Sequence, residues 1–176
     1  AHLENVKIAA AELGLGVALT LPFKGDVSDL QLDAMAGQIA ATQPDMVLNH
    51  GSAGVYAKLI AKARKTRIKT TFMAVNSGST QLAADLGPLA HGMVFAQVVP
   101  SPWERKHAIS REFQAAMAKG RPGVALSYGG LEGFLTAKAL VMALQATGRD
   151  LTRAKFVSAI ERSSFDLGGL GARYSS

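Results

Sequence analysis

Four short apolar runs, separated by segments with helical spacing, most restrict what this chain can fold into. Residues 17–21, 46–48, 70–75 and 92–99 have the apolar character of buried strands. Strands that alternate with helices through short connections are typical of a doubly wound parallel sheet. We therefore predict a three-layer α/β/α fold, with the loops gathered at one edge of a parallel sheet.

The helical segments carry their own start and stop signals. Residues 3–13 place apolar side chains at helical spacing, and Gly14 follows as a stop. Ser28 and Gln31 predict a capping box at the start of the second helix, and Ser52 is placed to cap the third. These signals support the alternation of helix and strand.

The pattern changes near residue 98. Pro100 and Pro102 restrict the backbone to an extended path, and little strand character follows them. We predict a domain boundary here, followed by three helices and then a glycine-rich turn with a terminal strand over residues 165–176. The three helices are expected at 103–119, 131–147 and 152–163.

Composition narrows the classes of partner. The chain of 176 residues is 48% hydrophobic and carries a net charge of +6, but only 6% of its residues are aromatic. Binding to nucleic acid needs a basic stripe interleaved with stacking aromatic rings, so no nucleic-acid partner is predicted. The main basic cluster is interpreted as a solvated helix face. It consists of Lys58, Lys62, Arg64, Lys65, Arg67 and Lys69.

No catalytic constellation is recognisable. The absence of cysteine excludes disulfides, thiolate metal sites and cysteine nucleophiles. The four histidines show no metal-ligand spacing, and no serine lies in a nucleophile elbow. The glycine-rich stretch at 168–171 lacks the lysine and hydroxyl of a phosphate loop. We therefore predict no enzyme activity, no cofactor and no metal.

Four segments, in their order along the chain, resemble one known family. They are QPDMVLNHGSAGVYAKLIAKAR at 43–64, IKTTFMAVNSGS at 68–79, the stretch from SYGGLEGF to FVSAIE at 127–161, and FDLGGLGARYSS at 165–176. The sequence resembles the C-terminal part of a type I periplasmic solute-binding protein. This is the extracellular ligand-binding receptor family that includes leucine/isoleucine/valine-binding proteins.

The resemblance implies two α/β lobes joined by crossing strands, with a ligand trapped between them by hinge closure. It assigns 1–97 to the second lobe without its first strand, 98–165 to a mainly helical return segment of the first lobe, and 166–176 to a strand crossing back toward the second lobe. The fold is therefore expected to be incomplete at its N-terminus. The missing strand is central in a doubly wound sheet, so a missing N-terminal half or a second chain is expected to supply it.

Ligands of open α/β sheets lie outside the carboxyl ends of the strands, so the loops after strands 46–48 and 70–75 are expected to reach the ligand. Both loops open helices, whose amino ends favour anions. The alternative is that their polar residues only form turns and caps, and that His50 bonds to backbone instead of a ligand carboxylate. Tyr128 is placed to flank the cleft, whereas Trp103 is interpreted as a packing residue at a helix start. The predicted ligand-binding residues are Asn49, His50, Gly51, Ser52, Asn76, Ser77 and Tyr128.

Asn76 bears on the class of ligand. The family often places an acid at the matching position, where it meets the α-ammonium group of an amino acid. An amide cannot neutralise that charge, and a buried unpaired charge costs several kcal/mol. We therefore expect a small aromatic or aliphatic carboxylate in preference to an ordinary α-amino acid, with an amino acid-like ligand as the alternative.

The resemblance implies the substrate-binding component of an ABC transporter. Such a protein lies in the periplasm and delivers a small molecule to a permease in the inner membrane. A signal peptide is not present in this sequence. A sensory ligand-binding module of the same fold is the alternative, and a dinucleotide-fold enzyme would need a cofactor motif that the sequence lacks.

Overall fold

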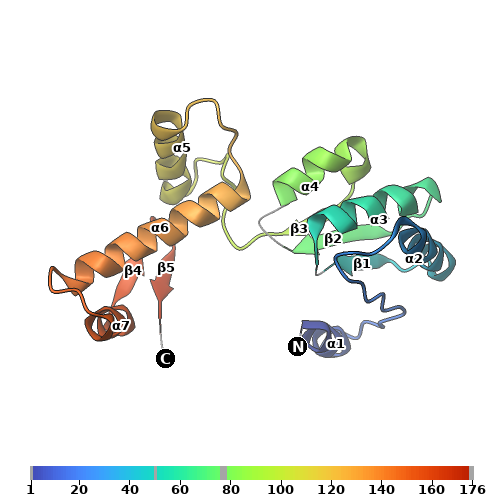
Figure 1. Ribbon diagram of the computed structural model, residues 1–176, viewed down its shortest axis with the longest axis horizontal. Coiled ribbons are helices and arrows are strands. Elements are labelled where there is room, and N and C mark those ends of the chain that lie inside the picture. Colours follow the sequence, from blue (N-terminus) through green and yellow to red (C-terminus); the bar gives the residue numbers. More distant parts are fainter. Residues whose placement is uncertain (1, 50, 76–78, 175–176) are drawn as a thin grey trace. The chain divides into compact units, whose positions relative to one another are not determined.

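The computed structural model describes residues 2–49, 51–75 and 79–174 (Figure 1). The chain divides into two compact units, Ala1–Ala96 and Gln97–Ser176. Each unit has a hydrophobic core of its own. We therefore describe each unit by itself.

The first unit contains a parallel sheet of three strands in the order β1-β2-β3. The strands are β1 (Met46–Asn49), β2 (Thr71–Val75) and β3 (Val94–Ala96). Asn49 pairs with Ala74 and Val75 pairs with Ala96, so the carboxyl ends of the three strands lie at one edge. The predicted parallel α/β sheet is confirmed, although β3 is shorter than the run at 92–99 that predicted it.

Besides a helix near the N-terminus, three α-helices and a turn of 3-10 helix are described in this unit. They are α2 (Asp29–Thr42), α3 (Ala53–Lys65), α4 (Ser79–Leu86) and η1 (Gly87–Ala90). The predicted capping box forms at α2, where the Ser28 hydroxyl accepts the N–H of Gln31 and the Gln31 side chain accepts the N–H of Ser28. Leu32, Ile60 and Phe72 are fully buried where α2 and α3 pack with β2. Burying such side chains stabilises the unit by about 1.5–3 kcal/mol each.

The predicted strand at residues 17–21 does not form. These residues lie in neither a strand nor a helix, and Val17 is exposed. A strand persists only where a neighbouring strand takes its backbone hydrogen bonds. In a doubly wound sheet this segment and β1 would flank a strand that precedes α1. Among the described residues no strand pairs with the run at 17–21, which follows α1 (His2–Glu12), so its backbone joins no ladder.

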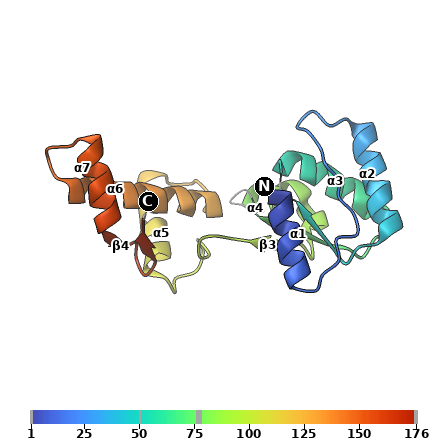
Figure 2. The ribbon, with the colours of Figure 1, turned by 90° about the horizontal axis from the view of Figure 1, so that it is seen from below.

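Helix α1 forms as the spacing predicts, but it packs weakly. Figures 1 and 2 show it on the side of the sheet away from α3. Leu3 and Ile8 on this helix are exposed, and Leu13 and Leu15 beyond it are exposed as well. The apolar side chains that predict this helix therefore do not join the core of the described part of the unit.

The second unit is mainly helical. It consists of α5 (Ala108–Gly120), α6 (Tyr128–Thr147), α7 (Arg153–Arg162) and an antiparallel hairpin of β4 (Ser164–Asp166) and β5 (Gly171–Arg173). Its core gathers Ile109, Phe113, Leu131 and Phe165 from the first two helices and the hairpin. The Thr152 hydroxyl caps α7 by accepting the N–H of Lys155. The predicted glycine-rich turn and terminal strand form, the strand as β5, and its antiparallel partner β4 was not predicted.

Helix α5 begins five residues later than predicted at Trp103, with Ala108 as its first residue. The physical reason lies in the side chains of α5 itself. Gln114 and Arg111 donate hydrogen bonds to backbone carbonyls of the preceding segment, and those carbonyls would otherwise accept helical N–H groups. The assignment of these residues to a return segment of a first lobe stays a prediction.

Candidate functional site

Polar residues follow β1 where it ends at the carboxyl edge of the sheet. Asn49 is half-buried, and its side-chain amide donates a hydrogen bond of 3.4 Å to the Gly51 carbonyl. Ser52 is exposed and immediately precedes α3. The structure thus places three of the predicted ligand-binding residues together at one end of one helix.

The hydroxyl of Ser52 does not cap α3, which corrects the capping prediction. Ser52 has φ −58° and ψ 127° and makes no capping hydrogen bond through its side chain. Ser28, Ser127 and Thr152, at the starts of α2, α6 and α7, all accept a backbone N–H. Where no side chain caps a helix start, the first backbone N–H groups can donate hydrogen bonds to another acceptor. An anion is a favourable acceptor, because the helix dipole is positive at this end.

Gly51 lies directly beneath an aromatic ring. A Cβ atom at this position would come within 2.6 Å of the Cζ atom of Phe23, a distance shorter than any real contact. Phe23 is half-buried and comes from the segment before α2. The lack of a side chain at Gly51 therefore lets the two loops touch, and it makes Phe23 part of the surface at the end of β1.

The Phe23 side chain also lines a hollow of about 540 Å³. This volume lies within the range of ligand pockets in proteins. Its wall is partly apolar and carries two exposed groups of opposite charge, Lys24 and Asp26. The sequence analysis missed this segment, although Pro22 and Phe23 directly follow the apolar run that it interpreted as a strand. The lining residues are Pro22, Phe23, Lys24, Asp26, Val27, Gln31 and Met35.

Tyr56 ties the start of α3 to the sheet. Its hydroxyl lies 3.1 Å from the Val47 carbonyl and 3.0 Å from the Met73 carbonyl, and the ring is 1% exposed. Burial raises the pKa of Tyr56 well above its ordinary range, so the hydroxyl stays protonated and donates. This contact fixes α3 to β1 and β2, and it thereby positions Gly51 and Ser52.

Three of the predicted site residues lie outside the described residues. They are His50, Asn76 and Ser77. The structure shows that β2 ends at Val75, beside the end of β1, and that α4 begins at Ser79. The prediction that both loops face the same edge of the sheet agrees with this strand register, and the roles of the three residues stay predictions.

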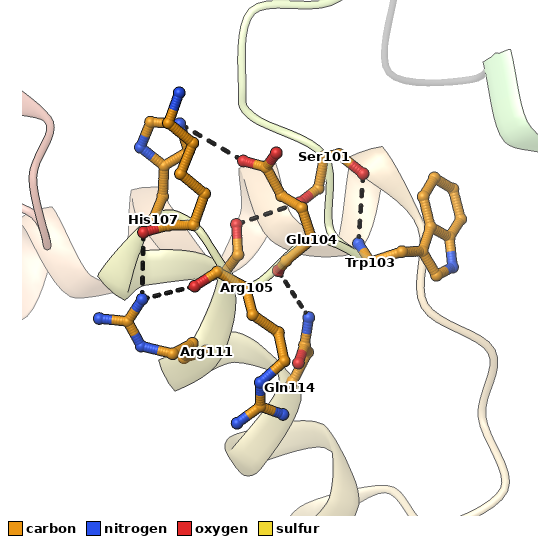
Figure 3. A network of polar contacts seen from close by, with 9 residues as sticks. Ser101, Trp103, Glu104, Arg105, His107, Arg111 and Gln114 are labelled. Carbon is orange, nitrogen blue, oxygen red and sulfur yellow. Dashed lines mark hydrogen bonds and ion pairs between the residues drawn. The ribbon is translucent and has the colours of Figure 1, made fainter.

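The last predicted site residue, Tyr128, belongs to the second unit. It is the first residue of α6, where the Ser127 hydroxyl accepts the N–H of Gly130 at 3.0 Å. The Trp103 ring meets the Tyr128 ring edge-on, with 5.4 Å between centroids and 84° between planes. Trp103 is 51% exposed and lies ahead of α5 (Figure 3), so its placement at a helix start was wrong, although its ring does pack against that of Tyr128.

The described ranges 2–49, 51–75 and 79–174 contain neither a metal-binding cluster nor a membrane-spanning helix. Among these residues no group of three or more histidine, aspartate or glutamate side chains is arranged to hold a metal ion. No helix within these ranges is long and apolar enough to cross a membrane.

The sequence matches the family model for periplasmic binding proteins over residues 2–175. No curated protein matches the sequence. Several solved structures are similar, and the chain spans about two fifths to one half of the length of each of them.

A possible leucine/isoleucine/valine-binding protein from Rhodopirellula baltica is 30% identical, with a TM-score of 0.70 over 77% of this chain and 39% of its own. An extracellular ligand-binding receptor from Verminephrobacter eiseniae is 28% identical, with a TM-score of 0.70 over 82% of this chain and 42% of its own. A substrate-binding periplasmic protein from Ralstonia solanacearum shares the fold, with a TM-score of 0.80 at 22% identity over 93% of this chain and 47% of its own.

Proposed function

The chain belongs to the periplasmic binding protein family, and we propose that it is part of the substrate-binding component of an ABC transporter. Membership in this family implies a solute-binding protein located outside the cytoplasm. The proposed partners are a small organic carboxylate as ligand and a permease in the inner membrane. The similarity to a possible leucine/isoleucine/valine-binding protein supports a ligand of amino-acid size.

The observation that carries this proposal is the start of α3. An exposed hydroxyl that makes no capping hydrogen bond lies there, at the carboxyl edge of a parallel sheet and beside Gly51. In open α/β sheets this edge is where ligands bind. The N–H groups at the start of α3, which the Ser52 hydroxyl does not cap, and that hydroxyl itself together offer hydrogen bonds to a carboxylate.

The adjoining hollow suits the rest of a small ligand. Phe23, Val27 and Met35 give it apolar surface, and Lys24 adds a cation. Asp26 also lines the hollow, so an α-ammonium group has one acidic group within reach of the same surface. Asn76 argues in the other direction, because an amide at the position that the family gives to an acid cannot offset an ammonium charge. We propose a carboxylate without an ammonium group as the preferred ligand.

Calorimetric titration of the full-length protein tests this choice with matched pairs of ligands. Leucine and isocaproate differ only in the α-ammonium group, and phenylalanine and phenylpropanoate form the same kind of pair. We expect the carboxylate of each pair to bind at least about tenfold more tightly, a difference of about 1.4 kcal/mol. Tighter binding of leucine than of isocaproate would contradict the proposed ligand class, and no binding by any of the four would contradict the proposed function.

Two hydroxyl variants separate a ligand contact from a structural role. Ser52→Ala removes a hydroxyl that caps nothing, so we expect weaker ligand binding and an unchanged melting temperature. Thr152→Ala removes a hydroxyl that accepts the N–H of Lys155 at 3.3 Å, so we expect a loss of about 1 kcal/mol of stability and unchanged binding. A stability loss in Ser52→Ala with unchanged affinity would assign Ser52 to the helix and not to the ligand.

A further inference from the structure

The ring of Phe23 approaches the start of α3 tip first. The ring atoms closest to the place that a Cβ atom of Gly51 would occupy are Cζ at 2.6 Å, Cε2 at 3.3 Å and Cε1 at 3.5 Å. These three atoms form the end of the ring that lies farthest from the Phe23 backbone. The ring therefore points at Gly51, directly before Ser52, and its two faces are turned to the sides.

Phe23 differs from its apolar neighbours because it does not join the hydrophobic core. Leu21 and Val27, on either side of it in the sequence, pack against the core of the first unit, and so does Met35. Phe23 is half-buried but is not part of this core in the described residues of the unit. Its ring lines the hollow instead. A structural role in the core therefore does not account for an aromatic side chain at this position.

The faces of the Phe23 ring are also not used by another ring. No other aromatic ring of the described residues stacks on it or meets its edge. Aromatic rings attract a second flat ring, either offset-stacked or edge-on, by more than the burial of their area alone provides. A planar group of a ligand in the hollow would supply such a partner.

We propose that Phe23 determines ligand specificity by presenting its ring to a planar apolar group of the ligand. The carboxylate of the same ligand lies at the start of α3, next to the tip of the ring. The preferred ligand is then an arylalkanoate, a carboxylate joined by a short chain to a flat ring. This inference rests on the proposed function, because it names the class of ligand for the same site. Every group that it uses belongs to the first unit.

Two ligands that differ in flatness test the assignment. Phenylpropanoate and cyclohexylpropanoate share the carboxylate and the chain, but the cyclohexyl ring is saturated and puckered. Burial of apolar surface alone favours the cyclohexyl ring, whereas contact with an aromatic ring favours the phenyl ring. In calorimetric titration of the full-length protein we expect phenylpropanoate to bind about threefold to tenfold more tightly. Equal affinities, or tighter binding of cyclohexylpropanoate, overturn the proposal.

A substitution of the ring tests whether Phe23 is the cause. Phe23→Leu keeps an apolar side chain but removes the flat ring, so we expect the preference for phenylpropanoate over cyclohexylpropanoate to disappear. The melting temperature should change little, because Phe23 lies outside the core. Leu30→Ala is the control, since Leu30 is 80% exposed and lies outside the lining of the hollow. A preference that persists in Phe23→Leu, or that disappears equally in Leu30→Ala, overturns the proposal.

A second substitution moves the ring without removing it. The methyl group of Gly51→Ala would collide with Cζ of Phe23, the far end of a side chain that can rotate away. We expect Gly51→Ala to reduce the preference for phenylpropanoate in the wild-type background and to change it no further in Phe23→Leu. Gly37→Ala is the matched control, because a Cβ atom there would meet nothing within 4 Å. Additive effects of the Gly51 and Phe23 substitutions on the preference overturn the proposal.

The outcomes also separate this inference from the proposed function. If Ser52→Ala weakens the binding of both ring ligands while Phe23→Leu leaves their ratio unchanged, the role of Phe23 is refuted and the proposed function stands. If isocaproate binds as tightly as phenylpropanoate, the arylalkanoate class is refuted and the proposed function again stands. If no amino acid or carboxylate among the probes binds to the wild-type protein, the proposed function fails and the role of Phe23 fails with it.

Discussion

Gly168 offers the sharpest structural test, because it joins the terminal hairpin to the start of α5. It lies in the turn between β4 and β5 with φ +100°, and its carbonyl accepts the N–H of Ile109 at 3.2 Å. A Cβ atom added here would lie 2.9 Å from the Ile109 nitrogen and 3.1 Å from its Cα. These are backbone atoms of a fully buried residue, so they cannot move aside as the end of a flexible side chain can.

The expected cost of Gly168→Ala has two parts. A positive φ of this size costs a residue with a side chain about 1–3 kcal/mol. Overlap with a packed backbone adds about 1–3 kcal/mol. We therefore expect the free energy of unfolding to fall by about 2–6 kcal/mol, which is large against the stability of a typical protein.

The neighbouring glycine provides the control. Gly169 has φ +89°, but a Cβ atom there would meet nothing within 4 Å. Gly169→Ala should therefore lose only the backbone part, about 1–3 kcal/mol. Urea unfolding of the two full-length variants, followed by circular dichroism, gives the difference directly. Equal losses in the two variants would refute the reasoning, because they would show that the contact with Ile109 contributes nothing.

Two further predictions concern single polar groups. Tyr56→Phe removes the hydroxyl that donates to the Val47 and Met73 carbonyls. We expect the free energy of unfolding, measured in urea, to fall by about 1–3 kcal/mol. An unchanged urea midpoint would mean that these carbonyls need no donor. For Asp166, the N–H groups of Gly169 and Gly168 hold its pKa below the ordinary value. Because the pKa of Asp166 is lower in the folded state, its ionised carboxylate stabilises the fold at pH values above the unfolded-state pKa. This stabilisation is lost as the pH falls through the folded-state pKa. We therefore expect the melting temperature to fall more steeply below about pH 4 in the wild type than in Asp166→Asn. Parallel melting curves for the two proteins across that range would contradict this prediction.

Much of the fold could be predicted from the sequence because its signals are local. The capping box at Ser28 and the apolar runs that became β1 and β2 depend on residues within a few positions of one another. The failures are of a different kind. The run at 17–21 has the composition of a strand, but a strand also needs a partner, and composition does not show whether the partner is there. The start of α5 was missed because Gln114 acts on carbonyls ten and twelve residues earlier.

The candidate site shows the same division. Asn49, Gly51 and Ser52 were predictable because they follow a recognisable strand and precede a recognisable helix. Phe23 was not, since its role depends on a contact with Gly51 that spans more than two dozen residues of chain. The place of Trp103 ahead of α5 was missed for a related reason, because it depends on the hydrogen bonds that Gln114 donates to the carbonyls of Pro102 and Glu104.

The way the backbone of residues 101–106 is held has a consequence for how this segment can change over time. Gln114, Arg111 and Ser110 all donate to main-chain oxygens of the segment, which every amino acid possesses. The path of the backbone is therefore largely independent of which side chains occupy residues 103–106. Substitutions at these positions can change the exposed side chains while the hydrogen bonds that hold the segment ahead of α5 stay in place.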